Sequence, residues 1–214
     1  MANLNRLISP PENCIACPRL ANYRIQNKIK YPLFFNAPVQ SFGQLDSELV
    51  IVGLAPGLKG ANQTGRPFTG DHAGNLLYAT LSKFGFSSGT YQARADDDVD
   101  LINCRITNAV KCLPPHNKPT GDEVAKCSDY LMKELTSMPY LKIILALGVL
   151  AHNAILSVFE ERKSLMKFGH HKKHSLKNGI KLINSYHCSR YNTNTGRLTA
   201  EMFESVFADI SNSL

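Results

Sequence analysis

Short, continuous apolar runs alternate along the chain with longer segments whose apolar residues recur every three or four positions. The runs have the length and composition of strands buried on both faces, and they lie at 47–52, 101–110, 141–147 and 180–185. The segments between them predict helices at 73–84, 120–137, 149–159 and 199–210. This alternation predicts an α/β fold, a three-layer α/β/α sandwich around a four-stranded parallel sheet.

Local signals mark the ends of some helices. Thr120, followed three residues later by Glu123, is a capping box, and Gly85 ends the helix predicted at 73–84. Residues 160–178 are charged and irregular, and 188–197 predict a loop. We expect one domain over residues 1–214, with an N-terminal arm, residues 1–45, that opens in a short basic helix or turn.

The loop from Gly53 to Asp71 leaves the first strand with five glycines in nineteen residues. Such a density lets the backbone approach a phosphate, a nucleotide or a flat base closely. The spacings of a P-loop and of a dinucleotide-binding loop do not occur in it. Its polar residues suit a site that grips a planar polar ring beside Phe68; they are Asn62, Thr64, Arg66, Thr69 and Asp71. The alternative is a connecting loop stiffened by Pro56 and Pro67.

The carboxyl ends of the four predicted strands carry residues of special chemistry. In parallel α/β folds the functional site lies outside these ends. They are occupied here by Gly53, Asn108, Gly148 and His187. We therefore expect these residues to meet at one edge of the sheet.

The charge balance narrows the class of partner. The chain carries 24 Lys and Arg residues against 17 Asp and Glu, a net charge of +7, which favours a polyanion such as nucleic acid. The apolar fraction of 43% excludes a disordered chain. No apolar run is long enough to span a membrane, and the N-terminus lacks a secretory signal. We expect a cytoplasmic monomer with no membrane partner.

Four of the six cysteines form two pairs. Cys14 and Cys17 make a CxxC motif, and fourteen residues separate Cys112 from Cys127. Four thiolates can ligate either a zinc ion or an iron-sulfur cluster. The uneven spacing favours a cluster, and the alternative is that these cysteines are small buried hydrophobic residues.

Six motifs in order along nearly the whole chain resemble one known family. They are Cys14-Ile-Ala-Cys17-Pro18-Arg19-Leu20, Gly53-Leu54-Ala55-Pro56-Gly57, Gly65-Arg66-Pro67-Phe68-Thr69-Gly70-Asp71, Thr107-Asn108-Ala109-Val110-Lys111-Cys112, Ala146-Leu147-Gly148 and His187-Cys188-Ser189. The family is the iron-sulfur uracil-DNA glycosylases, and the resemblance is closest to family 5, or type b. It implies the same α/β/α sandwich and a structural [4Fe-4S] cluster held by Cys14, Cys17, Cys112 and Cys127.

The chain departs from the family pattern at two places. Other branches carry a carboxylate in the first loop, where this chain has Leu54 and Ala55. The family 5 pattern then moves the water-activating role to Asp71, with Asn108. Cysteine stands at 188, where proline is commoner, and this brings a thiol near the expected active site.

The expected residues suit cleavage of a base from deoxyribose. That reaction leaves positive charge on the sugar and negative charge on the departing base. His187 can donate a hydrogen bond to the uracil carbonyl oxygen, and Asp71 can orient water and offset the sugar charge. Asn108 can read the pairing edge of a flipped base, while Phe68 stacks on its face. Each also has a purely structural reading; Asp71, for example, can simply cap the helix after it.

Further residues complete the expected site. The backbone of Gly53, Ala55 and Gly57 would form a pocket wall that closes on the flipped base. The resemblance implies that the segment after His187, with Ser189, Arg190 and Tyr191, fills the vacated space in the duplex. The basic tract at 163–177 can contact phosphates, or it can be a solvated loop.

We therefore expect a monofunctional glycosylase that hydrolyses uracil from DNA and leaves an abasic site. Other deaminated bases, such as hypoxanthine or xanthine, are further expected substrates. Apart from Lys111, the motifs contain no lysine that could act as a Schiff-base nucleophile for strand cleavage. The alternatives are a non-catalytic iron-sulfur nucleic-acid-binding protein of the same fold and a zinc-stabilised nucleotide-binding domain.

Overall fold

The computed structural model describes residues 8–214, and its main sheet has five strands in the order β4-β1-β5-β7-β6. These strands are β1 (Leu49–Gly53), β4 (Cys104–Asn108), β5 (Ile143–Leu147), β6 (Lys173–Ser175) and β7 (Lys181–Ser185). Strands β4, β1, β5 and β7 are parallel, which confirms the four predicted strands. The fifth strand, β6, pairs antiparallel with β7 at the edge and corrects the predicted count.

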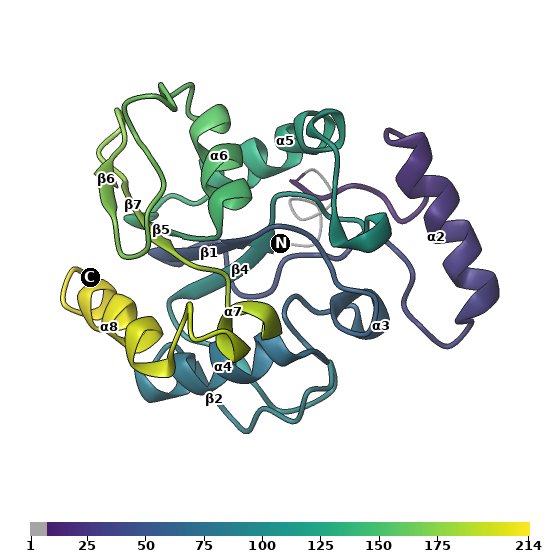
Figure 1. Ribbon diagram of the computed structural model, residues 1–214, viewed down its shortest axis with the longest axis horizontal. Coiled ribbons are helices and arrows are strands. Elements are labelled where there is room, and N and C mark those ends of the chain that lie inside the picture. Colours follow the sequence, from purple (N-terminus) through teal and green to yellow (C-terminus); the bar gives the residue numbers. More distant parts are fainter. Residues whose placement is uncertain (1–7) are drawn as a thin grey trace.

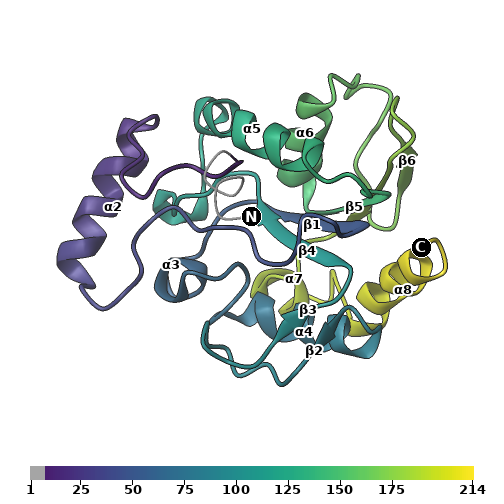
Figure 2. The same cartoon turned by 180° about the vertical axis from the view of Figure 1, so that it is seen from behind.

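Seven helices surround the sheet in the described residues. They are α2 (Pro18–Lys30), α3 (Ala61–Thr64), α4 (His72–Lys83), α5 (Gly121–Thr136), α6 (Val149–Val158), α7 (Arg190–Asn194) and α8 (Ala200–Ser211). In Figure 1, α5 and α6 cover one face of the sheet, while α4, α7 and α8 cover the other; Figure 2 shows the same layers from behind. The three-layer α/β/α sandwich is therefore confirmed. Among these residues, no helix is long and apolar enough to cross a membrane.

Strand β1 explains the three layers, because both of its faces are apolar. Leu49 and Ile51 pack into the core cluster that contains Leu77 of α4 and Phe203 of α8. Val50 and Val52 point the other way, into the cluster formed with α5 and α6. Successive side chains of a strand alternate between its faces, so a continuous apolar run packs into both core clusters.

The basic helix or turn predicted at the start of the arm is a helix of 13 residues, α2, which lies beside the body of the protein (Figure 1). Several other short elements were not expected from the sequence. The predicted strand at 101–110 is two strands, because Asp100–Leu101 (β3) pairs with Ser87–Ser88 (β2) in a separate hairpin. Helix α7 occupies part of the predicted loop at 188–197. Residues 1–7 of the predicted arm lie outside the described part of the chain.

A buried ionic network joins β4 to α5. The carboxylate of Glu134, which is fully buried, accepts hydrogen bonds from Arg105 Nε at 2.6 Å and Lys111 Nζ at 2.9 Å. It also accepts one from Thr107 Oγ1 at 2.8 Å, and Lys111 donates further to Ser41. Burial disfavours the charged carboxylate, but the two cations outweigh it and hold the pKa of Glu134 well below its usual range. Every charge in this network therefore has a partner.

Candidate active site

The carboxyl ends of the parallel strands meet at one edge of the sheet, as expected. Gly53, the last residue of β1, pairs with Asn108, the last residue of β4. On the other side of β1, strand β5 ends next to Gly148, and β7 ends two residues before His187. The four strand-end residues therefore lie along one edge.

A cavity of about 480 Å³, partly open to solvent, lies at this edge. Its walls come from the glycine loop, the start of α4, the 3₁₀ turn Pro115–Asn117, and the segment after β7. Six of the predicted site residues line it: Ala55, Gly57, Asp71, His187, Ser189 and Arg190. Tyr191, which was also expected there, lines it too.

The carboxylate of Asp71 serves the helix and the cavity at the same time. Its Oδ1 accepts hydrogen bonds from the backbone N–H groups of Ala73, at 3.1 Å, and Gly74, at 3.3 Å, and so caps α4. Its Oδ2 lies against the backbone of Gly60, where an added Cβ would clash with it. Asp71 can therefore be both a helix cap and a catalytic group, since Oδ1 caps the helix while Oδ2 makes no hydrogen bond to the described residues.

His187 is held at the cavity wall without any hydrogen bond from its ring to residues 8–214. Its Nδ1 is buried without a partner in that range, and its ring stacks on Phe68 with the centroids 5.7 Å apart. Burial lowers the pKa of His187, and the charge of Asp71 opposes that shift only in part. The imidazole is therefore neutral at physiological pH and carries one N–H.

Phe68, Asn108 and Gly53 form a second group directly behind the cavity. An added Cβ on Gly53 would clash with the Asn108 amide oxygen and the Phe68 ring, so only glycine fits there. Asn108 is buried, and its amide makes no hydrogen bond to the described residues. None of the three lines the cavity as Asp71 and His187 do; they reach it through the stacking of Phe68 on His187.

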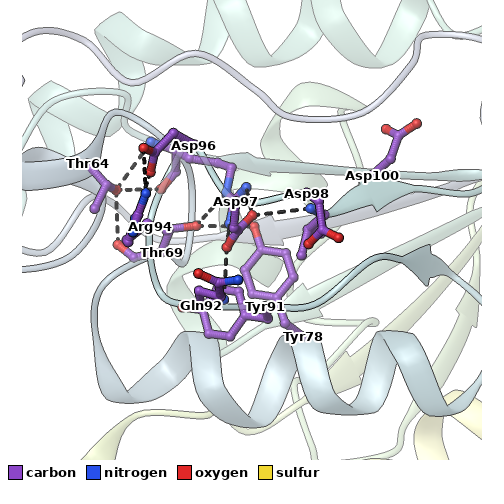
Figure 3. A network of polar contacts seen from close by, with 12 residues as sticks. Thr64, Thr69, Tyr78, Tyr91, Gln92, Arg94, Asp96, Asp97, Asp98 and Asp100 are labelled. Atoms are coloured by element: carbon purple, nitrogen blue, oxygen red, sulfur yellow. Dashed lines mark hydrogen bonds and ion pairs between the residues drawn. The ribbon is translucent and has the colours of Figure 1, made fainter.

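The other polar residues of the glycine loop hold the loop together. Figure 3 shows part of this network, with Thr64, Thr69 and Asp97 labelled. The buried Arg66 forms a bidentate ion pair with Asp97 at 2.6 and 2.8 Å. Arg66 Nε also donates to Thr69 Oγ1, at 2.8 Å. Asn62 donates to Asn36 at 2.9 Å, and Thr64 donates to Thr69 O at 3.0 Å. The prediction that these side chains grip a ligand is therefore not supported.

The sequence analysis missed two cavity residues. Asn117 stands in the proline-rich turn with a positive φ of 56°, and His72 is the first residue of α4. The Nε2 of His72 forms a 2.8 Å hydrogen bond with Thr193 Oγ1 of α7. Nothing in the local sequence marks Asn117, which reaches the cavity through folding of a distant segment, whereas His72 directly follows the predicted Asp71.

Helix α7 forms the outer wall of the cavity. Ser189 is its N-cap, and Arg190 and Tyr191 are exposed. Asn192 Nδ2 donates to the backbone carbonyl of His187 at 2.8 Å. Cys188, by contrast, is fully buried and does not line the cavity, and burial raises the pKa of its thiol.

The four predicted metal-binding cysteines come together around a second, small cavity of about 20 Å³. It lies between α2 and the segments that carry Cys112 and Cys127, and Cys14 and Cys17 line it as well. All four are free thiols. Burial, followed by repulsion from Cys127, raises the pKa of Cys112 to about 12. Within residues 8–214, no three His, Cys, Asp or Glu side chains are close enough to hold a single metal ion.

Part of the basic tract at 163–177 is neutralised by acidic neighbours, whereas Lys163, Lys167 and Lys172 form no ion pair with the described residues. Lys173 and His171 both contact Asp209, at 2.6 Å each, and Lys177 lies 3.9 Å from Glu161. Lys173 and His174 also belong to the edge strand β6. These pairings favour the interpretation of the tract as a solvated structural segment.

Comparisons with known proteins point to one family. The family model of the uracil DNA glycosylase superfamily matches residues 40–211. A type-5 uracil-DNA glycosylase of Thermus thermophilus is 40% identical over 201 residues, 92% of this chain and 91% of that protein. A type-5 enzyme of Pyrobaculum aerophilum is 39% identical over 210 residues, 95% of this chain and 88% of that protein. A type-4 enzyme of the same organism is 33% identical over 161 residues, 75% and 68% of the two chains.

Proposed function

Because this chain belongs to the uracil-DNA glycosylase superfamily, we propose that it hydrolyses the N-glycosidic bond of uracil in DNA and leaves an abasic site. The observation that carries the proposal is the pairing of Asp71 and His187 at one cavity, with Phe68 and Asn108 behind it. The site thus offers a negative group for the sugar and a neutral hydrogen-bond donor for the base.

His187 would stabilise the departing base. As the bond to the sugar breaks, negative charge develops on the uracil, and a donor placed at its carbonyl oxygen lowers the barrier. A neutral imidazole can donate one N–H to that oxygen, and burial keeps His187 neutral. Its ring makes no hydrogen bond to the described residues, so no protein group competes with the base.

Asp71 would act on the sugar side. The helix cap fixes Oδ1, so the carboxylate cannot rotate freely, while Oδ2 remains for a water molecule. That oxygen can orient the water for attack and offset the positive charge of the sugar. No lysine lines the cavity among the described residues, which agrees with hydrolysis without strand cleavage.

Asn108 and Phe68 would recognise the base. The buried amide of Asn108 has a donor and an acceptor that are free of described partners, as reading a pairing edge requires. The target nucleotide must leave the duplex to reach it. We include hypoxanthine and xanthine as substrates, because an amide that can present either a donor or an acceptor tolerates more than one base edge.

The duplex would rest on the loops around the cavity. Lys59, Lys118 and Arg190 are exposed and form no ion pair with described residues, unlike Lys173 and Lys177. Lys59 follows the cavity residue Gly57 by two positions, and Lys118 follows Asn117. We assign the phosphate contacts to these three cations. We keep the expectation of a cytoplasmic monomer.

The four cysteines would hold a [4Fe-4S] cluster. Thiolates are the donors such a cluster takes, and four of them surround one cavity rather than converging on a single ion position. When bound, the cluster would cross-link α2 to the segments at Cys112 and Cys127. Protein purified without oxygen should then be brown and contain iron and acid-labile sulfide, whereas a colourless zinc protein would refute this assignment.

The enzymatic proposal is tested with a duplex that carries one uracil. After incubation with the protein, hot alkali should break the strand at the uracil position, while a thymine duplex stays intact. Duplexes with hypoxanthine or xanthine test the wider specificity in the same assay. An intact uracil strand would favour the alternative, a DNA-binding protein of this fold without activity.

A further inference from the structure

We infer that Asn192 is a positioning residue, which lets the outer helix α7 set the place of the His187 imidazole. The inference rests on the proposed function, because it assigns His187 to the reacting base. It concerns a residue that touches no reacting atom and acts only through its neighbour.

His187 needs such support because its ring is otherwise weakly oriented. A histidine that donates from one nitrogen is usually held by a hydrogen bond at the other. Here Nδ1 is buried with no partner in residues 8–214, and the ring has only its stacking on Phe68, at 5.7 Å. The orientation of the imidazole therefore depends on where the backbone of His187 lies.

The backbone of His187 is anchored from α7. Asn192 Nδ2 donates to its carbonyl oxygen at 2.8 Å. A carbonyl can only accept, so the amide must present its NH₂ group there, which fixes the assignment of its two ends. Strand β7 ends at Ser185, so no hydrogen bond of the sheet holds the carbonyl of His187 in place.

A partner that docks on the outer side of α7 can shift His187 through this helix. It has only five residues, too few to persist alone, and depends on its ties to the body. Those ties include the Asn192 bond, the 2.8 Å contact between Thr193 and His72, and a 3.0 Å hydrogen bond from the backbone N–H of the buried Leu198 to the carbonyl of Asn192. Its other side presents Arg190 and Tyr191, the latter 71% exposed. DNA that docks on these two residues would press on α7, and Asn192 would pass the displacement to His187.

The chain offers a matched control for Asn192. Asn194, the last residue of α7, is exposed and its side chain makes no hydrogen bond to the described residues. We compare Asn192→Ala with Asn194→Ala, and the isosteric pair Asn192→Asp with Asn194→Asp, which places the same charge in the same helix. Maximal rates are measured with excess protein over a uracil duplex. Affinity is measured with a 2′-fluorinated uracil duplex, which resists cleavage.

Both Asn192 variants should lose about 10- to 100-fold in maximal rate, the cost of a misplaced catalytic group. Their affinity for the fluorinated duplex should match that of the Asn194 controls, because no DNA contact is removed. NMR titration of the free protein gives a second readout. In Asn192→Ala, the pKa of His187 should rise from its lowered position toward its ordinary value of 6.5 as water reaches the ring.

Equal maximal rates in the two members of a pair would overturn the inference, as would an unchanged His187 titration. A loss confined to affinity would also overturn it and make α7 a DNA contact only. The titration separates this inference from the enzymatic proposal. If the wild-type protein released no uracil but the titration moved, the proposed function would fail and the anchoring of His187 would stand.

Discussion

Strand β4 carries two buried polar regions on opposite faces, and they are satisfied very differently. On the α5 face, Arg105 and Thr107 belong to the network in which Glu134 has three donors. On the other face, Asn108 lies beside Phe68 and has no hydrogen-bond partner among the described residues. Buried polar groups normally find partners within the protein. The difference suggests that the first region maintains the fold and that the second is reserved for a ligand.

The largest expected effect separates activity from stability at Asp71. Asn at an N-cap is about as good as Asp, so Asp71→Asn should keep the cap of α4 and the melting temperature. The loss of the carboxylate charge should lower the single-turnover rate by about 10²- to 10⁴-fold. Asp98→Asn, in a loop outside the cavity, is the control and should keep the wild-type rate. A rate within a few-fold of wild type for Asp71→Asn would refute the assigned role.

The opposite behaviour is expected at Glu134. Glu134→Gln leaves Arg105 and Lys111 as buried cations without a counter-charge, which should reduce the free energy of unfolding by about 3–5 kcal/mol. Urea denaturation measures the change. Glu204→Gln, which breaks the exposed pair with Lys83, should cost at most about 1 kcal/mol. If both variants lose the same stability, the buried network does not maintain the fold.

A smaller, pH-dependent effect is expected at Asp97. Burial alone would raise its pKa, but hydrogen bonds from Arg66 and two backbone N–H groups hold it at about 2, against 3.8 for the free side chain. Because the folded pKa is depressed, the stabilisation is fully present above about pH 4 and is lost as the pH falls through 2. Its size is on the order of 2 kcal/mol. In urea titrations, the difference in the free energy of unfolding between wild type and Asp97→Asn should shrink from pH 5 to pH 2.

Removal of the Asn108 amide should cost no stability. Asn108→Leu has a similar shape and removes an amide that makes no hydrogen bond to the described residues, so the free energy of unfolding should not fall and can rise by up to about 1 kcal/mol. Uracil release should fall at the same time, because the base edge is no longer read. Thr107→Val, on the satisfied face of the strand, should instead destabilise the protein. A destabilised Asn108→Leu would mean that the amide has a structural partner after all.

The smallest effect concerns the phosphate contacts. Lys59→Ala and Lys118→Ala should each weaken DNA binding uniformly across sequences and reduce the slope of log affinity against log salt by about 1. Lys173→Ala, in the neutralised tract, should leave the slope unchanged because Lys173 is already paired with Asp209. If Lys173→Ala changed the slope and Lys59→Ala and Lys118→Ala did not, the phosphate contacts would lie in the basic tract instead.

The sequence predicted well the elements that are defined by their own pattern. The continuous apolar runs became the four parallel strands, and the Thr120 and Glu123 capping box is present in the structure. It failed where an element depends on distant partners. Lys-His-Ser at 173–175 has no strand pattern and is a strand only because it pairs with β7.

The site shows the same division. Residues at strand ends could be located from the sequence, because parallel strands bring their carboxyl ends together. The role of Arg66 could not, because its partner Asp97 lies 31 residues away. Likewise, the sequence around Asn117 and Asn192 does not predict that these residues reach the cavity region. What a polar side chain does depends on whether the fold supplies it with a partner.

The order of the strands also sets the distance between Asn108 and His187. Asn108 and His187 follow β4 and β7, which are three inter-strand spacings apart, about 14 Å at the usual 4.7–4.9 Å per step. Of the two strands between them, β1 ends at Gly53 and β5 is followed directly by Gly148. A side chain at Gly53 would strike Phe68, while Gly148 has a φ of 94° that disfavours any other residue. The width of the site is therefore fixed by the hydrogen-bond lattice of the sheet. Substitutions can narrow this gap, but widening it would require rebuilding the sheet itself.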